Sequence, residues 1–275
     1  MSTSQSMVAS VSRESQRELE FTGERIVPGK TVEALFREHE ERYIFAGRYV
    51  TGKDVLDIAC GTGVGTSFLR RAGARSILGL DIAEDAVAYA KARYPACEFA
   101  QGDAMNLCLP SESVDVVVSF ETLEHIQEQE KFLIECWRVL RPGGTLICST
   151  PNKTVYRWQG TNPFHFRELT LPRFVDLVST YFSQVKVFSQ SDQIYPFFVV
   201  WRLVSRALDR LNLKQTIKGL VKRDAAGGEL REEFCERDHI LIHPTQLHRI
   251  TWLKQPTYLI AVGQKVLPDS KGSNG

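Results

Sequence analysis

The sequence predicts an α/β protein with a Rossmann-like, doubly wound sheet of seven mostly parallel strands. Three observations predict this fold. Short apolar runs alternate with helical patterns, a glycine-rich turn follows the first run, and acidic residues stand at the ends of successive runs. The length of 275 residues and the apolar fraction of 43% suit one large domain of this class.

Strands are expected where apolar and β-branched residues stand together between turn residues. The run at 114–120 is apolar throughout, which predicts a central strand buried on both faces. Right-handed crossovers would bring the loops that follow the strands to one edge of the sheet, where ligands bind. The expected strands are 54–59, 76–81, 97–103, 114–120, 145–150, 184–190 and 257–266.

Between these runs, apolar side chains recur at helical spacing. An N-terminal helical segment precedes the sheet, Pro172 stands at the start of one helix, and "RPGG" at 141–144 ends another. The expected helices are 32–50, 66–73, 83–94, 128–140 and 171–182.

The chain divides into four parts by composition and pattern. Residues 1–20 are expected to form a disordered lead-in, and residues 21–190 the core with its helical cap. Residues 191–256 form an insertion before the last strand, expected to act as a lid or substrate-selecting element. Residues 257–275 hold the last core strand and a disordered tail. Within the insertion, 195–223 carries seven basic residues and one acidic residue, which fits a peripheral membrane contact or a lid helix.

Charge and cysteine usage limit the partners and the compartment. The net charge of +1 disfavours nucleic acid as a partner. Six scattered cysteines without a CxxC pair indicate a reducing cytoplasm, and no apolar run reaches the ~18 residues of a membrane span. We expect a cytoplasmic protein with a small-molecule or glycan substrate, and the sequence leaves the oligomeric state open.

The strongest local signal is "VLDIACGTGVG" at 55–65. A dinucleotide fingerprint would need glycine where Thr66 stands. Asp57, in the strand before the loop, would repel a pyrophosphate and suits a ligand that carries an amine. Asp81 ends the next strand, where a carboxylate accepts ribose hydroxyls, and Asp103 follows the third strand, near enough for an adenine amino group.

An aminoacyl, ribose and adenine ligand in that order is S-adenosylmethionine, and here the chain resembles the class I methyltransferases. The resemblance covers about residues 40 to 190 and includes "LDIACGTGVG", "GLDIA", "GDA" and "LRPGGTL". Ala59 stands where the family often has its first glycine, and we expect no loss of binding from so small a residue. The resemblance implies cofactor contacts from Asp57, Ala59, Gly61, Gly63, Asp81, Ile82, Asp103, Ala104 and Phe120.

The stretch "FETLEHI" at 120–126 follows the fourth expected strand. On a helix, Glu121, Glu124 and His125 would share one face. These side chains fit an acidic helix start, a general base at His125, or a divalent cation site. Carboxylates suit Mg²⁺ or Mn²⁺, and imidazole is tolerated better by Mn²⁺ or Zn²⁺.

The Glu-x-x-Glu-His pattern resembles the ubiquinone-biosynthesis O-methyltransferases. Together with "STPN" at 149–152 and His165 before "E-x-T", it resembles the small-RNA 3′-terminal 2′-O-methyltransferases. Both families are associated with a divalent metal and methylate one of two adjacent hydroxyls. The resemblance implies Mg²⁺ or Mn²⁺ at Glu121, Glu124, His125 and His165, with His125, His165 and Glu121 as catalytic residues.

The expected activity is O-methylation of a vicinal diol, with a sugar or glycosylated natural product as the favoured acceptor. "FTGERIVPG" at 21–29 resembles methyltransferases of glycan and secondary-metabolite pathways, and Trp158, Phe164 and Phe166 suit either sugar stacking or packing. The alternatives are a quinol or catechol, an RNA end, a metal-free enzyme with a histidine base, and a cofactor-binding scaffold without activity. His39 is expected on a solvated helix face, with a cleft-capping role as the alternative.

Overall fold

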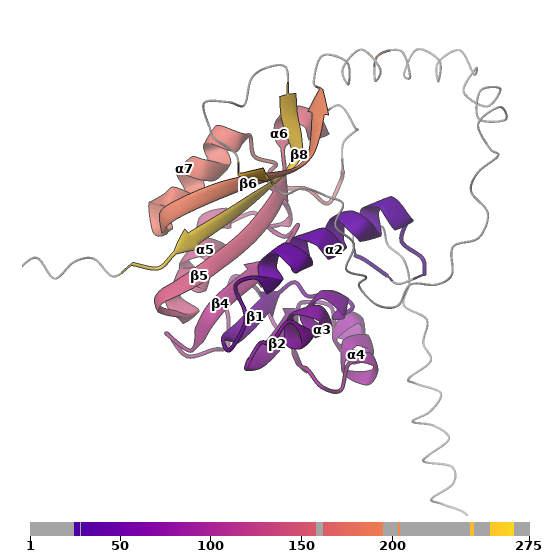
Figure 1. The fold of residues 1–275 in the computed structure, drawn as a ribbon, viewed down its shortest axis with the longest axis vertical. Coiled ribbons are helices and arrows are strands. Elements are labelled where there is room, and N and C mark those ends of the chain that lie inside the picture. The colour runs from indigo at the N-terminus through magenta and orange to yellow at the C-terminus, as the bar shows by residue number, and fades with distance from the viewer. Residues whose placement is uncertain are drawn as a thin grey trace, which may run out of the picture.

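A computed structural model describes residues 25–27, 29–157, 162–194, 203, 243–244 and 254–266. Its strands form one mixed sheet in the order β3-β2-β1-β4-β5-β8-β6-β7 (Figure 1). The strands are β1 (Asp54–Ile58), β2 (Ser76–Asp81), β3 (Glu98–Gln101), β4 (Val114–Ser119), β5 (Leu140–Pro151), β6 (Ser183–Ile194), β7 (His243–Pro244) and β8 (Lys254–Gln264).

The sheet is parallel from β3 to β5, and β8 runs antiparallel to both of its neighbours, β5 and β6. The last strand is therefore inserted inside the sheet rather than added at its edge. The predicted mostly parallel α/β sheet is confirmed, with the two-residue β7 as an addition at its edge.

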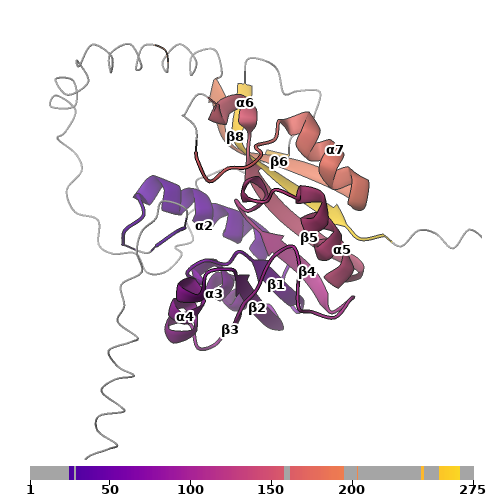
Figure 2. The same ribbon diagram turned by 180° about the vertical axis from the view of Figure 1, so that it is seen from behind.

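Helices cover both faces of the sheet (Figures 1 and 2). One apolar cluster joins the sheet to α2 and α3 through side chains such as Phe45 and Leu69, and another joins it to α5 and α7 through Phe132 and Phe174. The helices are α2 (Glu33–Gly47), α3 (Val64–Arg71), α4 (Glu84–Arg93), the 3₁₀ turn η1 (Leu123–His125), α5 (Gln129–Val139), α6 (Lys153–Tyr156) and α7 (Leu171–Tyr181).

The expected helices all occur, with ends shifted by a few residues. The largest difference is at β5, which begins at Leu140 and includes the "RPGG" stretch, with an irregular register between Val114 and Val116 on β4. No helix among the described residues is long and apolar enough to cross a membrane.

The predicted lead-in at 1–20, most of the insertion at 191–256 and the tail beyond 266 lie outside the described residues. So does the basic segment at 195–223, except Leu203. The strands beside the insertion reach into its predicted span, since β6 continues to Ile194 and β8 begins at Lys254.

Candidate active site

A cavity of about 590 Å³ lies at the edge of the sheet where the loops after β1, β2, β3 and β4 meet. This is the edge expected from the sequence, because right-handed crossovers bring the loops after parallel strands to the same side of the sheet. Two of the expected cofactor residues, Asp57 and Gly63, do not line it. The others do: Ala59, Gly61, Asp81, Ile82, Asp103, Ala104 and Phe120.

The glycines of the loop after β1 have different tasks. Gly61 has a φ of 54°, and a Cβ there would meet no atom within 4 Å, so its bare backbone faces the cavity. A Cβ on Gly63 would lie 2.8 Å from the Phe99 ring, and one on Gly65 would lie 2.0 Å from Tyr43 Cζ. Gly61 and Gly65 both line the cavity, but only Gly61 has room for a Cβ, while Gly63 and Gly65 allow close packing against Phe99 and Tyr43.

Asp57 lies beneath this loop and is completely buried. Tyr43 Oη donates hydrogen bonds to both of its oxygens, at 3.1 and 3.3 Å, and Thr66 Oγ1 donates to one at 2.6 Å. Burial raises the pKa of Asp57 from 3.8 to about 7, against the lowering effect of Thr66 and Tyr43. Asp57 thus ties α2 and α3 to β1 instead of lining the cavity itself.

Asp81 and Asp103 both line the cavity while fixing the backbone of their own loops. Asp81 accepts from the Gly61 amide at 2.7 Å and from the Ala83 amide at 2.9 Å. Asp103 accepts from the Met105 amide at 2.8 Å. A carboxylate has lone pairs for further donors, so both can also accept from ligand hydroxyl or amino groups.

The "FETLEHI" stretch is not the helix that its spacing suggested. Only Leu123–His125 forms a 3₁₀ turn, and Glu121 precedes it with a left-handed φ of 53°. Ser149 Oγ, on β5, donates a hydrogen bond of 2.6 Å to Glu121 Oε1. The expected shared helix face of Glu121, Glu124 and His125 is therefore wrong, because the chain leaves β4 through a sharp turn.

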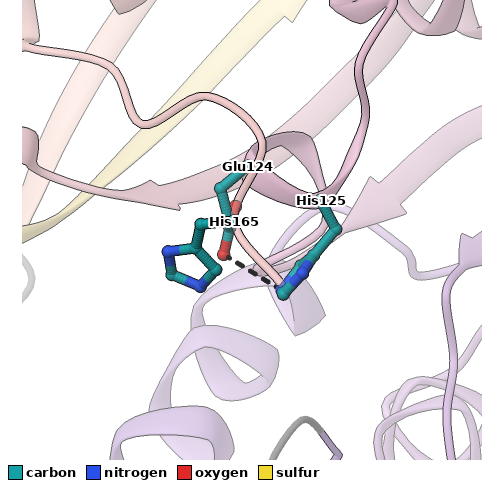
Figure 3. A group of neighbouring side chains, drawn as sticks. All are labelled: Glu124, His125 and His165. Carbon is teal, nitrogen blue, oxygen red and sulfur yellow. Dashed lines mark ion pairs between the residues drawn. The ribbon is translucent and has the colours of Figure 1, made fainter. Parts of the chain in front are cut away.

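Glu124, His125 and His165 nevertheless gather into one cluster (Figure 3). Each offers a ligand atom within 4.8 Å of the others, whereas Glu121 is not part of this group. The segment that carries His165 is joined to η1 by two amides, Phe166 and Arg167, that donate to the Glu124 carbonyl at 2.8 and 3.2 Å. Residues about 40 positions apart are thereby held together.

Each histidine of the cluster has its Nδ1 engaged. His125 Nδ1 lies 3.1 Å from the Phe164 carbonyl oxygen, which can only accept, so Nδ1 carries the proton and Nε2 the lone pair. His165 Nδ1 lies 2.9 Å from Glu168 Oε1, an arrangement that again places the lone pair on Nε2. Carboxylates and carbonyls on the far nitrogen are how proteins orient metal-binding histidines.

Glu124 is the buried carboxylate of the cluster, 1% exposed. Thr150 Oγ1 donates a hydrogen bond of 3.0 Å to its Oε2. Burial, and then the charge of Glu121, raise the pKa of Glu124 well above its usual value. The site is thus short of positive charge next to this group, although Arg42 partly offsets the effect.

A second cavity of about 90 Å³ adjoins the cluster, and Glu124 and His165 line it. His39, Glu121 and His125 line both cavities, so the cluster opens toward the large one. The favoured expectation of a solvated face for His39 is wrong, because His39 lines both cavities, which agrees with the alternative of a position at the cleft. Sequence reasoning missed Tyr43 and the two partners Thr150 and Glu168, although Glu168 follows His165 by three residues in the sequence.

The central part of the chain matches a known family. Residues 56–148 match "Methyltransferase domain". A "Probable S-adenosylmethionine-dependent methyltransferase" from Mycolicibacterium smegmatis is 43% identical over 166 residues, which are 59% of this chain and 64% of the relative. The chain thus spans just under two thirds of that relative's length.

Two further proteins are similar over other lengths. The phthiotriol/phenolphthiotriol dimycocerosates methyltransferase of Mycobacterium leprae is 38% identical over 40% of this chain and 43% of its own. A crystal structure of a S-adenosylmethionine-dependent methyltransferase from Archaeoglobus fulgidus has a TM-score of 0.55 at 16% identity, covering 86% of this chain and 96% of that one. The solved structure shows that the fold is shared, and the sequence matches relate residues 56–148 to methyltransferase domains.

Proposed function

We propose that this chain, whose residues 56–148 match a methyltransferase domain, transfers a methyl group from S-adenosylmethionine to a hydroxyl of a vicinal diol. The favoured acceptor is a sugar or glycosylated natural product, and a divalent metal takes part. The observation that carries the proposal is the cluster of Glu124, His125 and His165, which opens into the cavity formed by the loops after the parallel strands.

In the proposal, S-adenosylmethionine occupies the large cavity. Gly61 leaves room for the aminoacyl part, Asp81 accepts from the ribose hydroxyls, and Asp103 accepts from the adenine amino group. Ile82 is 70% exposed and lines the same cavity, which suits an apolar contact with the base. The acceptor oxygen attacks the methyl carbon, the carbon–sulfur bond breaks, and the hydroxyl proton is released.

The donor set fits a divalent cation. Two imidazoles with engaged Nδ1 atoms and one buried carboxylate offer three ligands, and Glu121 lies on the rim of the same small cavity. Two imidazoles favour Mn²⁺ over Mg²⁺. When bound, such an ion lowers the pKa of a coordinated hydroxyl and fixes its direction. Thr150 and Glu168 would then hold Glu124 and His165 in the ligating orientation.

A metal-free enzyme is the second candidate, and one contact favours it. The hydrogen bond from His125 Nδ1 to the Phe164 carbonyl leaves Nε2 as the basic nitrogen, which suits a general base as well as a ligand. In that case His125 would take the hydroxyl proton directly. Resistance of the activity to a chelator separates this candidate from the first.

The acceptor proposal rests on the rim of the large cavity. Phe164 and Phe166 line it and are 53% and 69% exposed, which leaves ring faces for a sugar. Trp158, the third expected stacking residue, lies outside the described residues. The name of the Mycobacterium leprae relative specifies a phthiotriol-derived acceptor, which is consistent with a hydroxyl target. A catechol and an RNA end remain the alternatives.

The test is turnover by the full chain. S-adenosylhomocysteine release would be measured with methyl α-mannopyranoside, catechol or a short RNA, each with Mn²⁺ or with excess chelator. We expect turnover of a diol that the chelator abolishes. Glu124→Gln should abolish it too, and Glu130→Gln, at a half-exposed position of α5, should not. Full turnover in chelator would refute the metal, and salt-sensitive turnover of RNA alone would refute the sugar.

A further inference from the structure

His39 lies on α2 and lines both cavities, between the expected cofactor site and the metal-type cluster. None of the residues that the proposed function uses comes from this helix. His39 is thus a polar side chain at the junction where an acceptor would lie, and its role depends on which of its nitrogens carries the proton.

Arg42 settles that question. Its Nη2 lies 2.7 Å from His39 Nδ1, and a guanidinium has only donors, so Nδ1 must accept. The proton of the neutral ring is therefore on Nε2. Burial, and then the Arg42 charge, hold the pKa of His39 well below its usual value, so the ring stays neutral near pH 7. No described residue accepts a hydrogen bond from Nε2.

Arg42 is itself held firmly. It is completely buried, donates a hydrogen bond of 2.7 Å to Gln190 Oε1, and lies 4.6 Å from the centre of the Tyr258 ring. Gln190, on β6, donates in turn to the Glu38 carbonyl and to Glu41 Oε2, both at 2.9 Å. These contacts clamp α2 to the sheet, so the direction of the His39 ring is fixed before any ligand arrives.

We propose that His39 donates a hydrogen bond from Nε2 to the non-reacting oxygen of the acceptor diol. This inference rests on the proposed function and names a contact that selects the acceptor. The ring cannot serve as the base without breaking its bond to Arg42, because Nε2 already carries the proton and Nδ1 faces a guanidinium. His39 instead orients the diol so that its other hydroxyl faces the methyl group.

The test uses 4-nitrocatechol, a vicinal diol whose visible spectrum reports binding. It is titrated into the full chain loaded with Mn²⁺ and S-adenosylhomocysteine. His39→Ala should weaken binding about tenfold, the effect of one lost hydrogen bond in a partly buried site. His39→Gln keeps an N–H near the position of Nε2 and should stay within about threefold of the wild type. Arg37→Ala, on the exposed face of the same helix, is the matched control.

These outcomes distinguish a failure of the His39 contact from a failure of the proposed function on which it rests. Equal affinity in His39→Ala and the wild type would overturn the contact. Equal loss in His39→Gln and His39→Ala would overturn the donor role. Mn²⁺ and S-adenosylhomocysteine affinities should be unchanged in all three variants, and a loss there would assign His39 to the fold instead. If the wild type binds Mn²⁺ but neither 4-nitrocatechol nor methyl α-mannopyranoside, the diol proposal itself is contradicted, and the His39 contact with it.

Discussion

Thr150 Oγ1 donates a hydrogen bond of 3.0 Å to Glu124 Oε2, which joins the end of β5 to the turn after β4. Thr150→Val keeps the volume and removes the donor, so the carboxylate loses the group that orients it. We expect Mn²⁺ affinity to fall 10- to 100-fold, the usual effect of losing a partner of a metal ligand. Calorimetry with Mn²⁺ measures this, and unchanged affinity would contradict the metal role of Glu124. Thr180→Val, whose hydroxyl donates to the Asp176 carbonyl on the exposed side of α7, is the control.

Alanine at Gly65 should mainly affect stability, and alanine at Gly61 should also affect cofactor affinity. A Cβ on Gly65 would lie 2.0 Å from Tyr43 Cζ, so Gly65→Ala should lower the free energy of unfolding by about 1–3 kcal/mol. Gly61→Ala meets no protein atom, but its left-handed φ of 54° strains an L-residue by roughly 1–2 kcal/mol, and the added Cβ fills the ligand side of the loop. Gly61→Ala should therefore weaken S-adenosylmethionine binding more than Gly65→Ala does. Urea unfolding and cofactor calorimetry on both variants separate the effects. An equal loss of cofactor affinity in both variants would refute the assignment of Gly61 to cofactor binding and Gly65 to packing.

Local pattern explains how much of this fold the sequence could predict. Each core strand is an apolar run between turn residues, and Asp81 and Asp103 follow such runs, so the cavity edge could be located in advance. The place of β8 between β5 and β6 could not, because strand order depends on contacts between distant segments. The same limit applies to His39: Arg42 reaches Gln190 across 148 positions, and nothing near His39 in the sequence reports it.

The glycine motif shows a second limit. Its spacing predicted one ligand-binding loop, but only the contacts with Tyr43 and Phe99 show that Gly65 and Gly63 serve packing. In the same way, the spacing of Glu121 and Glu124 suggested a helix, whereas the chain turns at Glu121 with a left-handed φ. A pattern of residue types fixes which groups are present but not the turn that orients them.

Replacing Ala59 by glycine should stabilise the protein. It occupies the position where the resembled family often has glycine, with a left-handed φ of 58° that costs an L-residue roughly 1–2 kcal/mol. Ala59→Gly should therefore raise the free energy of unfolding by up to about 1 kcal/mol. The gain is smaller than the strain because glycine also makes the unfolded chain more flexible and so favours it. Ala88→Gly, at an exposed position inside α4, should lower it by about 1 kcal/mol. Urea unfolding of both variants is the measurement, and destabilisation by Ala59→Gly would contradict the strain.

Asp57 should give the stability of the fold a distinctive dependence on pH. Its pKa is about 7 in the folded chain and 3.8 as the ordinary value, because it is buried under the loop after β1. Between these values the folded state holds a proton that the unfolded state has lost, so the contribution of Asp57 to stability falls as pH rises from about 4 to 7. At pH 8 the buried carboxylate is ionised and its cost is fully present, on the order of 2–4 kcal/mol.

Asp57→Asn removes the titration, so the free energy of unfolding of the variant minus that of the wild type should grow between pH 4 and pH 8. The other titrating groups are the same in both proteins, so their effects cancel in this difference and its pH dependence reports Asp57. A poorer fit of the amide against Tyr43 and Thr66 would shift the difference equally at every pH. Asp54→Asn is the control, because hydrogen bonds from Arg75 lower the pKa of Asp54 below its ordinary value of 3.8. The contribution of Asp54 is lost only as pH falls below about 4, so this variant minus the wild type should be nearly flat between pH 5 and pH 8. A difference between Asp57→Asn and the wild type that is flat across this range would show that Asp57 does not carry the shifted pKa.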